Sequence, residues 1–148
     1  MSENLEVSVD IAASPEQVWA VVSDLRRMPE FSPQCRKMFV LGSLRVGART
    51  ININRNGRIF YLTASKIIRV EPNTAIAWQA DKAVWSYVLE PTVGGTRLIE
   101  RRDLAKPVTG ISKAGLPLVF GSAVDRDAVL TDGMRTTLGR IKAAVEGA

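Results

Sequence analysis

Residues 35–104 consist of short apolar runs that turn residues interrupt at intervals of about ten residues. This pattern is typical of an antiparallel meander, in which consecutive strands pair with one another. It predicts six strands, at about 35–41, 47–54, 58–70, 75–80, 84–90 and 96–104. The clearest hairpin signal is Asn56-Gly57, because both residues tolerate the positive φ angles of a tight turn.

The segment before the meander predicts one more strand and a helix. Residues 5–11 alternate apolar and polar with a period of two, which indicates a half-buried strand. Ser14, Pro15 and Gln17 then provide an N-cap, a proline for the first turn and the partner of a capping box. A helix therefore begins there, and a shorter helical turn is expected near 25–31, where prolines break the pattern.

The C-terminal part predicts a loop and a long helix. Residues 105–117 contain two prolines and two glycines, so they are expected to form a loop before a final helix that ends near residue 145. Apolar residues fall on one stripe of this helix. They are Leu116, Phe120, Ala123, Leu130, Met134, Leu138, Ile141 and Val145.

These elements together predict one α+β domain that spans residues 1–148. Seven antiparallel strands must twist and curl, and the concave face of the sheet then needs a cover. Only the final helix is long enough. The expected architecture is a curved seven-stranded antiparallel sheet wrapped around a long C-terminal helix, with two short helices after the first strand.

Several short motifs occur along the chain in an order that is similar to one known family. They are residues 14–19, 23–25 with Pro29 and Phe31, 46–49, 70–73 followed by Trp78, and 89–91 followed by 94–97. The chain resembles the START-like, or SRPBCC, superfamily of polyketide cyclases, dehydrases and lipid-transfer proteins. The resemblance implies the helix-grip fold and a cavity between sheet and helix. It specifies function poorly, because one such cavity serves many ligands and few chemistries.

Composition excludes several kinds of site. The chain has no histidine and a single cysteine, Cys35, so neither a Ser-His-Asp nor a Cys-His arrangement is possible and a tetrahedral zinc site lacks ligands. No phosphate-binding loop or dinucleotide fingerprint occurs. We therefore expect no metal and no cofactor.

Charge and targeting signals bear on partners and location. The formal net charge of +5 suggests an affinity for phosphates, but the basic residues are interpreted as scattered pairs separated by acids, so nucleic-acid binding is not expected. The N-terminus lacks the basic flank and apolar run of a secretory signal, and no apolar run is long enough for an integral membrane segment. A cytoplasmic monomer or homodimer is expected.

Strand parity names candidate cavity residues. Ile51 and Ile53 are predicted to face the cavity, with Asn52 and Asn54 facing water. Trp78, Trp85 and Tyr87 share the parity of inward apolar residues, and their aromatic rings suit a pocket wall or a packed core equally well.

Charged residues near the predicted cavity form a second group. Glu100 and Arg102 share the parity of Leu98 and Leu104, so they face inward if the leucines do, where they would neutralise one another and orient a polar ligand end. The alternative register, with Ile99 inward and the charges in water, stays open. Asp127 falls within the apolar stripe of the final helix, a costly place for a carboxylate.

Three interpretations of Asp127 follow from this position. The predicted one is a contact with Arg102 across the cavity. The others are a kink near Gly133 that rotates the helix face, or a purely structural pair with an arginine of the sheet.

The favoured function is binding or transport of a small hydrophobic or amphipathic ligand, such as a lipid or a polyketide-like molecule. The alternative is a polyketide cyclase or dehydratase in which Asp127, Glu100 or Tyr87 moves protons. A partner-binding module is a third hypothesis, which predicts an exposed apolar patch and a well-filled cavity. The candidate ligand-binding residues are Ile51, Ile53, Trp78, Trp85, Tyr87, Glu100, Arg102, Phe120, Asp127 and Met134.

Overall fold

The computed structural model describes residues 4–33, 35–56, 58–80, 82–104 and 123–147, with the backbone alone at residues 56 and 123–129. The first elements are β1 (Leu5–Ile11), α1 (Pro15–Val22), the 3₁₀ turn η1 (Leu25–Arg27) and α2 (Met28–Phe31). The meander comprises β2 (Cys35–Leu41), β3 (Arg49–Asn56), β4 (Ile59–Glu71), β5 (Ala75–Ala80), β6 (Ala83–Thr92) and β7 (Gly95–Leu104), and α3 (Ala123–Glu146) follows. The predicted order of elements is confirmed, with strand ends that differ by one or two residues. The loop predicted at 105–117 lies outside the described residues.

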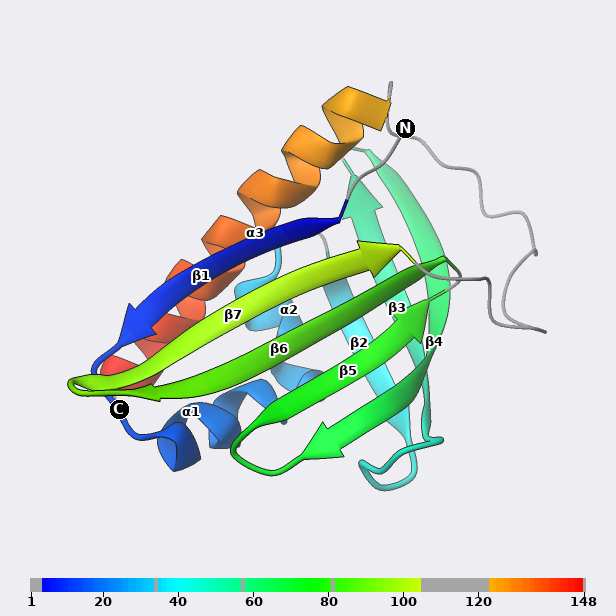
Figure 1. The fold of residues 1–148 in the computed structure, drawn as a ribbon. Coiled ribbons are helices and arrows are strands. Elements are labelled where there is room, and N and C mark those ends of the chain that lie inside the picture. Colours follow the sequence, from blue (N-terminus) through cyan, green and yellow to red (C-terminus); the bar gives the residue numbers. More distant parts are fainter. Residues whose placement is uncertain (1–3, 34, 57, 81, 105–122, 148) are drawn as a thin grey trace.

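All seven strands form one antiparallel sheet in the order β1-β7-β6-β5-β4-β3-β2. The N-terminal strand thus pairs with the last strand of the meander. Figure 1 shows that the sheet curls, so that β1, β7, β6 and β5 face β2, β3 and β4, with α3 alongside β1. The helix α3 contacts β1, β7 and the short helices α1 and α2. Among the described residues, no helix combines the length and the apolar character needed to span a membrane.

The start of α1 confirms the predicted capping box. The Gln17 backbone N–H donates to Ser14 Oγ at 3.2 Å, and the Ser14 backbone N–H donates to Gln17 Oε1 at 2.9 Å. Two amides that the helix itself leaves without a partner are therefore satisfied, which directs the chain from β1 into α1.

The β6–β7 turn holds the end of β1 in place. Gly95 has a φ of +153°, and a Cβ atom there would overlap the Ile11 carbonyl oxygen and crowd the Ala13 backbone nitrogen. The next residue, Thr96, donates from its hydroxyl to the Ala13 carbonyl oxygen at 2.7 Å. Glycine is required at position 95 because two backbones approach too closely for any side chain.

One face of α3 closes the core. Its buried side chains join a cluster with α1, α2 and the inward side chains of the sheet, in agreement with the predicted helical stripe. Those contributed by the described part of α3 are Met134, Leu138, Ile141 and Val145, and Leu130 is buried on the same stripe outside this cluster. The predicted stripe members Leu116 and Phe120 lie outside the described residues, as does the side chain of Ala123.

Candidate functional site

The inward face of β7 carries two charged side chains, those of Glu100 and Arg102. Thr96, Leu98, Glu100 and Arg102 are all buried, whereas Ile99 is partly exposed. The register with Ile99 inward is therefore wrong, and the one that turns Glu100 and Arg102 inward is correct. The alternation ends at Leu104, which is exposed at the last position of the strand.

Glu100 is the most unusual group on this face. Its neighbours in register are Val7 on β1 and Tyr87 on β6, and only 6% of its surface is exposed. The buried Oε1 atom has no hydrogen-bond partner among the described residues. Burial raises the pKa of Glu100 from its ordinary 4.5 to about 8, because the charged form loses its hydration. At neutral pH the carboxyl is mostly protonated, so it is a hydrogen-bond donor.

Tyr87 lies beside Glu100 and is fully buried. Its hydroxyl makes a weak hydrogen bond to Met28 Sδ at 3.7 Å, and its ring centroid lies 5.8 Å from that of Trp78. Burial, followed by the charges of Glu100 and Cys35, raises the pKa of Tyr87 well above its usual value. Tyr87 is therefore a second neutral donor, next to the first.

Arg102 is buried between Leu5 of β1 and Trp85 of β6. An ion pair with a cation lowers the pKa of a carboxyl, whereas the pKa of Glu100 is raised. Burial accounts for the raised pKa of Glu100, and its mutual neutralisation with Arg102 stays a prediction.

A hydrogen-bonded polar cluster occupies the inward face of β3 and β4. Thr50 Oγ1 hydrogen-bonds with Ser65 Oγ and donates to Asn52 Oδ1 at 3.1 Å. The Nδ2 atoms of Asn52 and Asn54 each donate to Thr63 Oγ1 at 3.1 Å. These side chains satisfy one another across the two strands, which allows Thr50, Asn52 and Ser65 to be buried.

The prediction that Ile51 and Ile53 face the cavity is wrong. Ile51 is 42% exposed and Asn52 only 6%, so the asparagines point inward and Ile53, at the parity of Ile51, points outward. A signal for this register was present in the sequence. Arg49 and Arg55 share the parity of the two isoleucines. If the isoleucines faced the core, both arginines would bury their charges there as well, which is unfavourable.

The structure places the other described candidates in or against the core cluster. Trp78 and Met134 belong to the core cluster together with Tyr87, and Trp85 packs against that cluster next to Trp78. Phe120 lies outside the described residues, and so does the side chain of Asp127. A contact between Asp127 and Arg102 remains a prediction.

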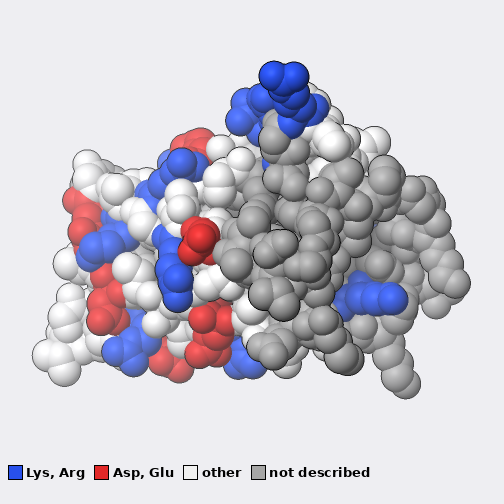
Figure 2. Space-filling view, turned by 90° about the horizontal axis from the view of Figure 1, so that it is seen from above, with Lys and Arg blue, Asp and Glu red and all other residues white. Residues whose placement is uncertain are grey.

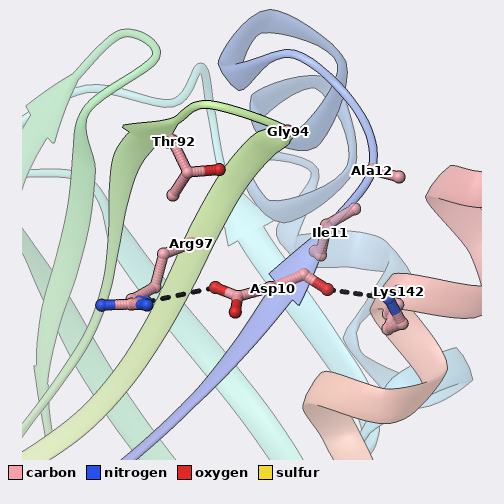
Figure 3. Close-up of a pocket in the computed structure, with 7 residues that line it drawn as sticks. All are labelled: Asp10, Ile11, Ala12, Thr92, Gly94, Arg97 and Lys142. Atoms are coloured by element: carbon pink, nitrogen blue, oxygen red, sulfur yellow. Dashed lines mark hydrogen bonds and ion pairs between the residues drawn. The ribbon is translucent and has the colours of Figure 1, made fainter.

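A separate open pocket lies where β1 ends, between the β6–β7 turn and α3 (Figure 3). Lys142 Nζ donates to the Asp10 carbonyl oxygen and contacts Glu146 Oε2, both at 2.7 Å. Arg97 Nε contacts Asp10 Oδ1 at 3.1 Å. Both cations already have oxygen partners, so this pocket ties α3 to β1 and offers no uncompensated charge to a ligand.

No cluster of three or more potential metal ligands occurs in the part of the chain that the structure describes.

Comparison with known families is decisive for the fold. The family model described as "Polyketide cyclase / dehydrase and lipid transport" matches residues 2–146. The chain belongs to this family. A search of curated proteins found no match.

Solved structures of two aromatase/cyclases share the fold. The Zhui aromatase/cyclase from Streptomyces sp. R1128 is 18% identical, with a TM-score of 0.73 over 97% of this chain and 93% of that chain. The di-domain aromatase/cyclase StfQ of the steffimycin biosynthetic pathway is 15% identical, with a TM-score of 0.74 over 97% of this chain and 50% of that chain.

A polyketide_cyc-like protein from Corynebacterium glutamicum is 28% identical, with a TM-score of 0.65 over 99% of this chain and 93% of that chain. These similarities confirm the predicted helix-grip fold. They do not by themselves assign a ligand or a reaction, because the fold hosts more than one function.

Proposed function

We propose that this protein binds a small amphipathic ligand at the inward face of the sheet, with a carbonyl or hydroxyl group of the ligand at Glu100. The observation that carries the proposal is the buried Oε1 atom of Glu100, which lacks a hydrogen-bond partner among the described residues. Leaving a buried polar atom unsatisfied costs about 1–3 kcal/mol. A ligand that supplies the partner offsets this cost.

The neighbouring side chains support an amphipathic ligand. Trp78, Trp85 and Met134 offer apolar surface, while Glu100 and Tyr87 are neutral donors at one point of it. A few polar groups in an otherwise apolar site set the orientation of a ligand. Two donors side by side favour an acceptor such as a carbonyl oxygen. This chemistry is common to polyketide-like molecules and to lipids with an ester or ketone group.

The proposal is tested with an acylnaphthalene dye whose emission responds to hydrogen bonding at its carbonyl. We expect saturable binding to the wild-type protein and energy transfer from the nearby tryptophans. Glu100→Leu should weaken binding roughly ten-fold, the effect of about 1.4 kcal/mol. Glu90→Leu is the matched control, because Glu90 is an exposed glutamate on the neighbouring strand β6. Equal binding by Glu100→Leu and wild type would contradict the proposal.

A second candidate is a cyclase or dehydratase reaction, which the raised pKa of Glu100 favours. A carboxyl that still holds its proton near pH 7 can protonate a carbonyl oxygen or a departing hydroxyl group, and its conjugate base can then take a proton back. The similar Streptomyces protein is itself described as an aromatase/cyclase.

Glu100→Gln separates the two candidates. Glutamine keeps a donor of the same shape but cannot transfer a proton in this way. If the protein is an enzyme, wild type should convert an aromatic poly-β-ketone, and Glu100→Gln should bind the molecule without converting it. If the protein only binds, wild type returns the molecule unchanged.

A further inference from the structure

Basic residues are concentrated in one continuous stretch of the chain. Between Glu30 and Glu71 there is no acidic residue, so the interpretation of the basic residues as pairs separated by acids is wrong for this stretch. Residues 31–70 therefore carry a formal charge of +8, and the remainder of the chain carries −3. This stretch forms β2, β3 and β4, which make up one side of the curled sheet (Figure 1). Its basic residues are Arg36, Lys37, Arg45, Arg49, Arg55, Arg58, Lys66 and Arg69.

The outward face of the same three strands is apolar. Residues that pair across strands share a face, and the register places five large apolar side chains together on the face opposite Asn52. Each is 42% to 60% exposed. We call them the outer patch: Phe39, Leu41, Ile51, Phe60 and Leu62.

Cations border the outer patch along the same rows of cross-strand pairs in β2, β3 and β4. Arg49 pairs with Leu41 and Lys66, and Lys37 lies beside Ile53, which in turn pairs with Leu62. Arg55 pairs with Phe60, and its Cζ atom lies 5.3 Å from the centroid of that ring. Every outward side chain in these rows is therefore apolar or cationic. Elsewhere the two signs of charge intermingle, as on the left of Figure 2, whereas Lys and Arg project without acids at the top edge of that view.

We propose that the outer patch docks the protein on an anionic lipid bilayer. Exposed apolar side chains grouped in one place, rather than scattered singly, mark an interaction surface. Apolar side chains that enter the headgroup region, surrounded by Lys and Arg that contact anionic lipids, are the composition that interfacial membrane binding requires. Lys and Arg stems can follow the apolar side chains while their charges stay at the headgroups. The inference is independent of the proposed function, because the patch lies on the opposite face of the sheet from Glu100.

Other occupants fit the patch less well. A second copy that docked through the same face would bring Lys37, Arg49, Arg55 and Lys66 against themselves. Nucleic acid would gain nothing from the aliphatic side chains Leu41, Ile51 and Leu62. A protein interface normally includes neutral hydrogen-bonding side chains at its rim, whereas these rows contain none within β2, β3 and β4, and the first is Gln79 of β5, next to Lys66. A bilayer needs only the two classes of side chain that are present.

Co-sedimentation of the full chain with vesicles tests the proposal. We expect binding to vesicles of phosphatidylcholine with phosphatidylserine, weakened by added salt, and little binding to phosphatidylcholine alone. Two double variants separate the contributions, Phe60→Ser with Leu62→Ser and Arg49→Gln with Lys66→Gln. Each should lower the affinity roughly ten-fold or more. Circular dichroism and thermal unfolding check that the variants remain folded.

The matched controls keep the same chemistry outside the patch. Val93→Ser removes a fully exposed apolar side chain in the β6–β7 turn, and Arg135→Gln removes an exposed cation of α3. Both should bind as wild type does. The proposal is overturned if the anionic vesicles are not bound, or if the controls weaken binding as much as the patch variants. Normal vesicle binding by the Phe60 and Leu62 double variant would also overturn it, because the attraction would then be due to charge alone. So would binding of the protein to an acidic polypeptide but not to vesicles.

Discussion

Glu100 on β7 and Tyr87 on β6 are register partners and lie side by side. Both side chains are buried, and the pKa of each is raised. Ionisation of Glu100 is itself one cause of the raised pKa of Tyr87, after burial. Two neutral donors therefore lie side by side at neutral pH. The Glu100–Tyr87 pair thus offers protons and hydrogen bonds rather than a fixed charge.

The pH dependence of stability should reveal the proton on Glu100. Its pKa is about 8 in the folded protein and near the ordinary 4.5 when unfolded. Between these values the folded state holds a proton that the unfolded state has released, so the free energy of unfolding should fall as pH rises. We expect a loss of about 3 kcal/mol between about pH 5 and pH 8, measured by urea unfolding.

Glu100→Gln should remove this dependence, because glutamine does not titrate. The variant should match wild type at acidic pH and exceed its stability at about pH 8. Glu90→Gln, at an exposed position of β6, should keep the wild-type slope. Parallel pH profiles for Glu100→Gln and wild type would mean that Glu100 is ionised in the folded protein.

Thr50→Val should destabilise the protein although it preserves shape. The substitution removes the hydroxyl that hydrogen-bonds with both Ser65 and Asn52, and leaves buried polar atoms without partners. We expect a loss of about 1–3 kcal/mol in the free energy of unfolding. Thr92→Val is the control, since Thr92 is exposed on β6, and should change stability by less than about 0.5 kcal/mol. Equal effects at both positions would count against the polar cluster.

Gly95→Ala should be severely destabilising. The added Cβ atom would overlap the Ile11 carbonyl oxygen, so the β6–β7 turn or the end of β1 must move. A cost of about 3 kcal/mol or more is expected in urea unfolding. The adjacent Gly94→Ala is the control, because a Cβ there meets nothing within 4 Å. Similar midpoints for the two variants would show that the turn tolerates a side chain.

Cys35 should react slowly in the folded protein. Burial raises the pKa of its thiol to about 11, and the thiolate is the reactive form. Alkylation by iodoacetamide near neutral pH should be slow in buffer and fast in denaturant. Mass spectrometry of the time course measures both rates, and a native rate close to the denatured one would contradict the described burial.

The local and periodic features of this protein were determined by the sequence alone. The capping box at Ser14 depends on residues three apart, and the stripe through Met134, Leu138 and Ile141 depends on helical periodicity. Each is encoded within a short segment, so no knowledge of distant contacts was needed to predict it.

The direction in which β3 faces was established by the tertiary structure. Alternation shows that Ile51 and Asn52 point to opposite sides, and the parity of Arg49 and Arg55 is the signal within β3 that favours the isoleucines outward. Asn52 is buried because Thr50, Thr63 and Ser65 form a hydrogen-bonded cluster with it across two strands, which leaves the isoleucine in the outer patch. Glu100 likewise meets Tyr87 only through the pairing of β7 with β6. A side chain's partners across a sheet are distant in sequence, and it is those partners that determine which polar groups can be buried.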